Sequence, residues 1–563
     1  MKGDLSNFFE MWDFTGVRYH MDFCRREERP GPGPVNDICM NKGAKCWTRW
    51  PLGEKQLWSR VPEVFWYALA GAFCCGLLTH GMALFNKLSW HDDIFSLFMT
   101  GTTVKLGRWM LHVIVEFEKW FYGNGQFSIP AVNGIYSLVC IGLSAGLLVS
   151  HWRIRSRSLS ALTGMMMAVF PVITGLFSFM FTVHYYMLSL LMIVGGSLLI
   201  CAKGKAAWGK KLAGILLCGC AIGIYQAFIP IMLMIILIDV VMDLIQGEEK
   251  VSTLLGRVLI LALCVAGAMG VYFAGSKYFL WKENLQLDSY MGISEMGTAT
   301  LGDYLNRVIV AYREFFHPTH FSLWDMYPQA MFNVYRLMLC LDILLGLLFA
   351  VQTWKKSPVK ALLLLVALAL VPLGCNFIFV MSEEIHSLMV YGQVMQMVLL
   401  VCLVDKAEWP GAAMKSLLRR GTALLMALGG IMYFRYDNQC YLKAVFQQQE
   451  AISWNTTLVT RIESIEGFRD ELPVAFVNRE NMQDRNLYNL TEFDFLSIGT
   501  YDNNIQGFMN DWAWKAFMER WCGFGPEMVD AQLVENWPEV QAMPSYPDAG
   551  SIQILQDVIV VKF

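Results

Sequence analysis

The chain has 563 residues, of which 55% are hydrophobic and only 16% are charged. Charged residues make up about a quarter of an ordinary soluble chain, so this composition indicates a membrane protein. The net charge of -3 is close to neutral and argues against a nucleic-acid partner, which would need a basic surface.

Residues 1–60 are polar and rich in proline and glycine, with basic clusters at Arg25-Arg26 and at 42–49. No apolar core of a cleavable signal peptide precedes them. We therefore expect a cytoplasmic leader that is partly disordered. Its cysteines lack the spacing of a zinc site.

Long apolar stretches dominate the next part of the chain. A spanning helix needs roughly 20 mostly apolar residues, and this criterion predicts about eleven crossings. The predicted crossings are 63–85, 129–150, 159–179, 183–201, 212–224, 228–244, 254–275, 331–351, 361–381, 385–404 and 422–434. The sequence therefore predicts an all-α polytopic membrane protein over residues 61–435.

Lysine and arginine gather in alternate loops, which is typical of cytoplasmic loops. The basic loops lie near 153–157, 203–211, 250–257, 355–360 and 406–420. This pattern places the N-terminus inside and the two long connections, 86–128 and 276–330, outside. An odd number of crossings then places the region after residue 435 outside as well.

Residues 436–563 change in character and predict a small extracytoplasmic α/β domain. The polar stretch 444–466 has a helical pattern, and the apolar or alternating runs 473–478 and 552–563 indicate strands. Turn-rich segments separate these runs.

Two adjacent carboxylates, Asp92 and Asp93, follow the first predicted crossing. Ionisable residues near a membrane helix end are costly to desolvate and are functional candidates by default. A carboxylate on the outer surface could accept a proton from an attacking hydroxyl as a general base. The alternative interpretation is a polar cap on a helix that begins near Ile94.

In the same outer loop, Lys105, Arg108, His112, Glu116 and Lys119 recur at helical spacing. Because a neighbouring face is apolar, we predict an amphipathic helix in the outer membrane interface. Lys105 and Arg108 could hold a phosphate, Arg by its planar fork and Lys as a point charge. Contact with lipid headgroups is the alternative.

Further polar residues gather at the same predicted outer rim. Tyr225 and Gln226 interrupt an apolar run that is too long for one helix and too short for two with a loop, which predicts a tight outer turn. Any single His or Tyr is commonly a structural residue, but their accumulation on one side favours a substrate site. The other candidates for substrate binding are His184, Arg307, Arg313, Glu383 and His386.

Soluble-enzyme signatures are absent from the sequence. It has no Gly-rich phosphate loop, no His-Glu-x-x-His and no nucleotide-binding fingerprint. A lipid-borne donor therefore fits better than a nucleotide sugar.

Four short motifs carry a resemblance to a known family. They are Asp92-Asp93 after the first crossing, Gly107-Arg108-Trp109 in the outer helix, Tyr225-Gln226 at an outer turn, and Tyr436-Asp437-Asn438-Gln439 at the start of the tail. In order and sidedness these motifs resemble the integral-membrane O-antigen-type glucosyltransferases.

The resemblance implies a GT-C-type fold in a bacterial cytoplasmic membrane. Such enzymes transfer a hexose, typically glucose, from a polyprenyl-phosphate carrier to a glycan or lipid-linked acceptor on the outer face. Carried over by position, Asp92 or Asp93 would be the base of an inverting displacement, and Lys105 and Arg108 would neutralise the leaving phosphate. His91 stands where Asn or a similar polar residue is expected, so its role stays open.

Polyprenyl phosphate is a stable leaving group, so the protein must mainly orient the hydroxyl and stabilise developing charge. No cofactor is required, although paired carboxylates could bind a divalent metal. The alternatives are a transporter or flippase of lipid-linked sugars and a non-catalytic membrane scaffold. A transporter should show repeated halves and charged or broken helices at mid-membrane, whereas the polar residues here concentrate at the outer rim.

Overall fold

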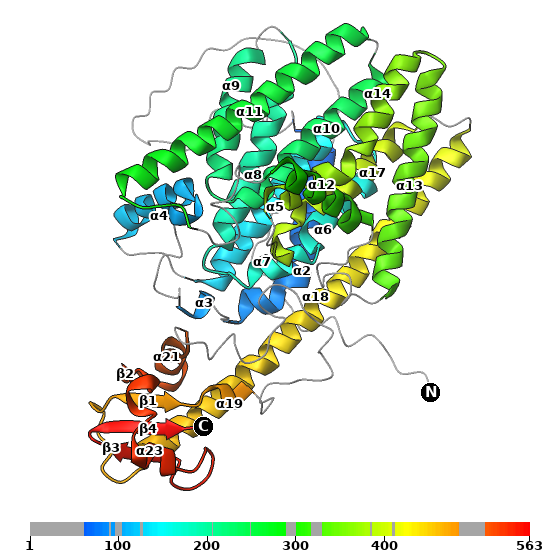
Figure 1. Ribbon diagram of the computed structural model, residues 1–563. Coiled ribbons are helices and arrows are strands. Elements are labelled where there is room, and N and C mark those ends of the chain that lie inside the picture. Colours follow the sequence, from blue (N-terminus) through cyan, green and yellow to red (C-terminus); the bar gives the residue numbers. More distant parts are fainter. Residues whose placement is uncertain are drawn as a thin grey trace, which may run out of the picture. The chain divides into compact units, whose positions relative to one another are not determined.

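The computed structural model describes residues 61–88, 92–95, 104–123, 128–204, 207–247, 249–288, 300–316, 329–382, 385–407, 411–483 and 513–563. The predicted leader, 1–60, lies outside these residues. Helices dominate the described part of the chain (Figure 1).

Seven stretches of the described chain are long and apolar enough to cross a membrane. Five are single helices: α2 (Glu63–Phe85), α5 (Pro130–His151), α8 (Val183–Ile200), α11 (Val251–Lys282) and α13 (Gln329–Trp354). The other two combine η3 (Gln226–Phe228) with α10 (Ile229–Gln246), and α14 (Pro358–Ala369) with α15 (Val371–Cys375). The protein is therefore a polytopic helical membrane protein.

Several predicted crossings differ from single straight helices. The stretch 159–179 forms two helices, α6 (Arg157–Val169) and α7 (Val172–Phe177), on either side of Pro171. Proline lacks the backbone N–H of a helix interior, which explains this break. The other shorter elements are α9 (Ala207–Ile222), α16 (Ile378–Met381), η5 (Ser387–Met389), η6 (Tyr391–Gln393) and α17 (Val394–Lys406).

Small residues let α2 and α6 pack backbone to backbone. A Cβ atom on Gly164 would lie 1.9 Å from the carbonyl oxygen of Ala68, and one on Gly71 would lie 2.1 Å from that of Ala161. Membrane helices associate through close packing at small residues, because lipid offers no hydrophobic driving force. This pair of glycines therefore fixes α2 against α6.

A single helix of 52 residues, α18 (Ala412–Glu463), contains the last predicted crossing. At 1.5 Å per residue it is about 78 Å long. It passes without interruption through position 435, where the sequence analysis places a domain boundary, and includes most of the polar stretch 444–466. The membrane-buried part and the C-terminal sheet are thus joined by continuous helix.

The C-terminal residues form a sheet of four strands: β1 (Val474–Val477), β2 (Met528–Val529), β3 (Ile552–Leu555) and β4 (Val558–Lys562). The order is β2-β1-β4-β3, with β1 parallel to both neighbours and β3 antiparallel to β4. Gln556 and Asp557 take positive φ between β3 and β4, as a tight hairpin requires. The strands lie within the predicted runs 473–478 and 552–563, except for β2.

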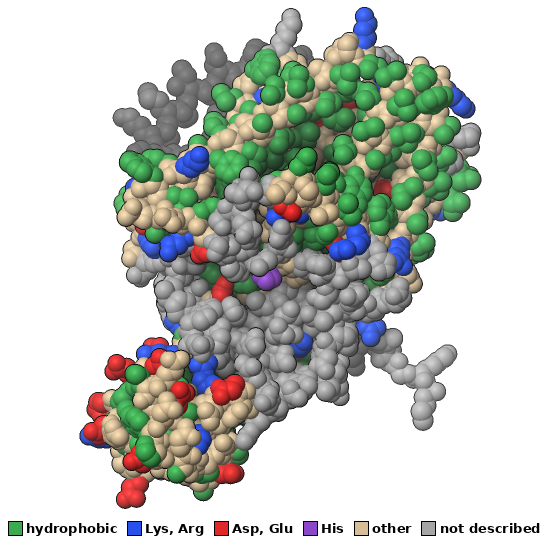
Figure 2. Space-filling view, in the orientation of Figure 1, with side chains coloured by type: hydrophobic (Ala, Val, Ile, Leu, Met, Phe, Trp, Pro, Cys, Tyr) green, Lys and Arg blue, Asp and Glu red, His purple; other side chains and the backbone are tan. Residues whose placement is uncertain are grey.

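Short helices complete this region: α19 (Glu480–Gln483), α21 (Trp514–Phe517), η9 (Met518–Cys522), α22 (Ala531–Val534) and α23 (Pro538–Ala542). Figure 2 shows charged side chains gathered over the C-terminal sheet and a largely apolar face on the membrane helices. Leu259 and Leu263 on α11 are 62% exposed, which fits contact with lipid.

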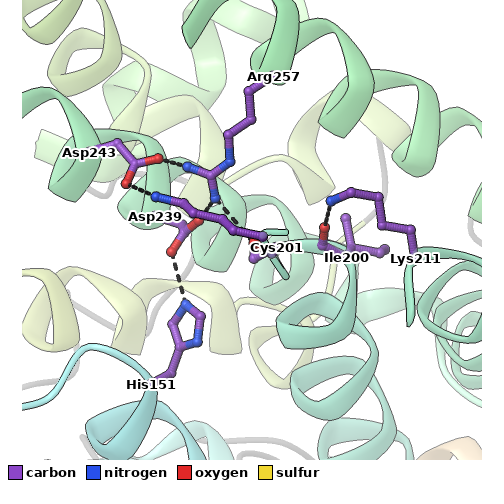
Figure 3. A network of polar contacts seen from close by, with 8 residues as sticks. His151, Ile200, Cys201, Lys211, Asp239, Asp243 and Arg257 are labelled. Atoms are coloured by element: carbon purple, nitrogen blue, oxygen red, sulfur yellow. Dashed lines mark hydrogen bonds and ion pairs between the residues drawn. The ribbon is translucent and has the colours of Figure 1, made fainter. Parts of the chain in front are cut away.

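A network of charged side chains links helix ends next to the predicted cytoplasmic loops (Figure 3). Asp239 of α10 binds His151, at 2.9 Å, and also Arg257 of α11. Asp243, one turn further along α10, pairs with Arg257 and Lys203. His151 ends α5, whose 22 residues span about 33 Å, so the network is remote from residues that precede α5.

Candidate functional site

Asp93 lies in the short helix α3 (Asp92–Phe95) and is completely buried. Its Oδ1 accepts hydrogen bonds from the Ser128 hydroxyl, at 2.8 Å, and from the Phe181 backbone amide, at 2.9 Å. Its Oδ2 pairs with the Lys87 ammonium, which also donates to Ser128 at 2.6 Å. Both oxygens of this carboxylate are therefore engaged by groups of the protein itself.

The two adjacent carboxylates thus differ in environment. Asp92, in the first turn of α3, is partly exposed, whereas Asp93 is 0% exposed. Burial lowers the pKa of Lys87, and the neighbouring Asp93 acts against that shift. Removal of one partner of a buried ion pair strongly destabilises a folded protein. Asp93 therefore anchors the segment that contains α3.

The Gly107-Arg108-Trp109 turn lies between η2 (Val104–Leu106) and α4 (Trp109–Tyr122). Gly107 has φ +70°, and a Cβ there would lie 2.6 Å from the Tyr272 hydroxyl and 3.0 Å from Nε2 of Gln226. Glycine is required at this position both for its conformation and for the close approach.

Arg108 sits against two stacked tyrosines. Its Nη1 donates a 2.8 Å hydrogen bond to the Tyr186 hydroxyl, and its guanidinium lies 5.6 Å and 5.7 Å from the ring centroids of Tyr186 and Tyr225. The two rings stack at 4.1 Å. Its Nε is buried and has no hydrogen-bond partner among the described residues.

Gln226 holds this cluster together. Its Nε2 donates to the carbonyl oxygen of Leu106, at 2.7 Å, and to the Tyr272 hydroxyl, at 3.2 Å. The Tyr225 hydroxyl reaches the carbonyl oxygen of Leu388, at 3.5 Å, in the loop that carries His386. The structure therefore brings the Arg108 turn, the Tyr225-Gln226 turn and α11 into direct contact.

The start of α8 connects the two groups of residues. Phe181, just before this helix, binds Asp93, and Tyr186, within its first turns, binds Arg108. A third contact joins Tyr185 to Glu118 of α4. Helix α4 and the aspartate segment are thus both bound to residues at the start of α8.

Other predicted site residues lie apart from this cluster or on its margin. Lys105 is exposed beside the Arg108 turn, and His184 belongs to an aromatic group with Tyr136 and Tyr185. His386 is exposed, and Glu383 lies outside the described residues.

The two predicted arginines of the second outer loop lie on α12 (Leu301–Phe316). Arg307 is buried, with its guanidinium 5.6 Å from the Tyr304 ring centroid. Arg313 pairs with the buried Glu314 at 3.2 Å. Each of these arginines contacts a neighbour on α12 itself, Arg307 the Tyr304 ring and Arg313 the Glu314 carboxylate.

Sequence reasoning missed three contact residues of the cluster, Lys87, Ser128 and Tyr272, whereas Tyr186 was noted beside His184 as part of the polar outer rim. Lys87 had a usable signal, because a lysine directly after a spanning helix and close to two aspartates invites an ion pair. Ser128 and Tyr272 had none, since a serine or tyrosine near a helix end is common.

The expectation that polar residues concentrate at the outer rim is incomplete. Asp342 lies in the middle of α13, is buried, and accepts a hydrogen bond from Gln396 of α17. Asp437 of α18 is also completely buried, and neither of its carboxylate oxygens has a hydrogen-bond partner among the described residues. Among the described residues, no group of three or more His, Cys, Asp or Glu could hold a metal ion.

A family model described as Glucosyl transferase GtrII matches residues 81–397, more than half of the chain. The chain belongs to this family. The resemblance inferred from the short motifs is therefore confirmed, and the chain is a glucosyltransferase. Searches of curated proteins and of solved structures find no match.

The GtrII match includes Lys87, Asp93, Arg108 and the Tyr225-Gln226 turn. It ends before α18 and the C-terminal sheet. GtrII membership also decides against the transporter and scaffold alternatives, although Asp342 and the broken helices are features that a transporter would share.

Proposed function

We propose that the protein transfers a hexose, glucose in keeping with its family, from a polyprenyl-phosphate donor to a cell-surface glycan. The reaction takes place at the outer face of the bacterial cytoplasmic membrane. The observation that carries this proposal is the difference between the two aspartates: Asp93 is completely buried and bound by three groups of the protein, whereas Asp92 is partly exposed.

Asp92 is the general base in this proposal. A base must come within hydrogen-bond reach of the acceptor hydroxyl, and the partly exposed carboxylate of Asp92 can be reached from outside the protein. Asp93 cannot approach an acceptor unless it leaves Lys87, Ser128 and Phe181. It therefore acts as the anchor that orients its neighbour.

Arg108 binds the donor phosphate. The tyrosine rings and the Tyr186 hydroxyl hold its guanidinium in place, and its unpartnered Nε is a donor that a phosphate oxygen can satisfy. Lys105, exposed at the same turn, adds a second positive charge. Both positive charges stabilise the negative charge that develops on the phosphate as it leaves.

The reaction is a single displacement with inversion. The acceptor oxygen attacks C1 of the sugar as Asp92 takes its proton, and the bond between C1 and the phosphate oxygen breaks. Polyprenyl phosphate leaves with the bonding electrons.

The proposed topology has eleven crossings, a cytoplasmic N-terminus and an extracytoplasmic α/β domain at 436–563. Support comes from the four remaining predicted crossings, which are helical: α6 with α7, α9, α17 and the first part of α18. The grouping of residues from the basic loops in the network of His151, Lys203 and Arg257 also favours it.

Separate Asp92→Asn and Asp93→Asn variants test the base assignment. Membranes containing the full-length chain receive radiolabelled polyprenyl-phosphate glucose, with surface polysaccharide from the producing cells as acceptor. We expect Asp92→Asn to lower transfer about a hundredfold or more, as removal of a general base does. Full activity of Asp92→Asn contradicts the assignment, and transfer that no sugar lipid supports contradicts the donor class.

A further inference from the structure

Residues from the far end of the chain hold the helix that carries the aspartates. Arg520 in η9 donates a 3.1 Å hydrogen bond to the backbone carbonyl of Ile94, 426 positions earlier in the sequence. The Ile94 side chain is 0% exposed and belongs to the same buried cluster as Trp514 and Phe517. A residue of α3 therefore completes the hydrophobic core of the C-terminal region.

The other flank of α3 is held by α18. Gln448 donates a 2.9 Å hydrogen bond to the backbone carbonyl of Lys87, whose ammonium pairs with Asp93. The segment from Lys87 to Ile94 is thus fixed at both ends by residues that lie beyond the family match of 81–397.

A helix of four residues is not stable by itself, because the conformational entropy lost in forming the first turn exceeds the stabilisation from its hydrogen bonds. Its position must come from tertiary contacts. Catalysis is sensitive to such placement, since a shift of about 1 Å in a reacting group can cost a hundredfold in rate.

We propose that the C-terminal region is a positioning element for transfer, in which Arg520 and the core that receives Ile94 set the position of Asp92. This inference rests on the proposed role of Asp92. Arg520 is a positioning residue: it acts on the backbone of α3 and touches no reacting atom.

Arg520→Ala and Arg520→Lys in the full-length membrane-embedded chain test this inference. We expect Arg520→Ala to lower kcat about tenfold with little change in the KM for polyprenyl-phosphate glucose, because the donor site at Arg108 is separate. Arg520→Lys keeps an N–H donor and should recover much of the loss. Hydrogen exchange of residues 92–95 should be faster in Arg520→Ala.

Arg469→Ala is the matched control. Arg469 belongs to the same region but forms an exposed ion pair with Asp557, at 2.8 Å. Such pairs contribute little, so transfer and hydrogen exchange should stay as in the unmodified chain.

If Asp92→Asn abolishes transfer but Arg520→Ala changes neither kcat nor hydrogen exchange, the inference is overturned and the proposed function still stands. Full activity of Asp92→Asn instead removes the proposed base. If Arg520→Ala does not accumulate in membranes, Ile94→Val provides the same test. Faster hydrogen exchange in α3 together with a lower kcat supports the inference. Unchanged hydrogen exchange and kcat overturn it.

Discussion

Asp93 accepts a hydrogen bond from the backbone amide of Phe181, 2.9 Å away and 88 positions later in the chain. The same carboxylate binds Ser128 and Lys87, so three segments of the chain meet on one side chain. This relationship separates the roles of two neighbouring aspartates that are indistinguishable by sequence.

Removal of Asp93 should destabilise the protein more than removal of the whole ion pair. In Asp93→Ala the Lys87 ammonium stays partly buried without its carboxylate, which typically costs about 3–5 kcal/mol. The double variant Lys87→Met/Asp93→Leu should recover part of that loss. Thermal unfolding in detergent of the unmodified protein, Lys87→Met, Asp93→Leu and the double variant measures the cycle, and additive losses would show that the pair is not coupled.

Arg108→Lys should reduce transfer even though the charge is kept. Lysine cannot place a planar cationic group against the stacked Tyr186 and Tyr225 rings, and it has no Nε to offer to a phosphate. We expect kcat/KM for the sugar lipid to fall about tenfold or more, which corresponds to roughly 1.4 kcal/mol. Arg313→Lys, at an exposed position on α12, is the control; an equal loss there would move the phosphate site to the second outer loop.

Gly107→Ala should impair both stability and transfer, because its Cβ would lie 2.6 Å from the Tyr272 hydroxyl at φ +70°. Gly123→Ala is a close control, since Gly123 has φ +76° and nothing within 4 Å of the added Cβ. The control should show only the cost of a left-handed alanine, about 1 kcal/mol. Equal losses of unfolding temperature and activity in the two variants would contradict a specific packing role for Gly107.

Asp239→Asn should lower stability without a specific effect on the reaction. It removes the charge that faces Arg257 and His151 at the helix ends remote from Asp93. Glu63→Gln, which breaks an exposed pair with Arg157 at 2.7 Å, should cost at most about 1 kcal/mol. Unfolding temperature and kcat measured together decide this: a lower kcat at full stability would assign the network a role in transfer.

Local patterns in the sequence predicted much of the architecture. Helix α2 spans the predicted residues 63–85, and β1, β3 and β4 lie within the predicted strand runs. The helix that follows Arg108 was also foreseen from its periodicity. These features depend on apolar runs and side-chain periodicity, which each segment carries by itself.

The sequence was a poorer guide to where helices break and where they continue. The break at Pro171 divides one predicted crossing, and α18 continues through the position at which polar residues suggested an end. A polar helix is stable when neighbouring segments cover it, and the buried Asp437 and Gln447 of α18 show such cover. Composition alone does not reveal which segment supplies it.

The sequence by itself determined the membrane class, the family motifs and the presence of a carboxylate pair beside a basic and aromatic turn. Only the tertiary structure decided that Asp93 is an anchor, that Tyr186 and Tyr225 hold Arg108, and that Ile94 enters the C-terminal core. The physical reason is that side-chain periodicity shows which face of a segment is buried, whereas the partner that buries it is chosen by packing between segments far apart in the chain.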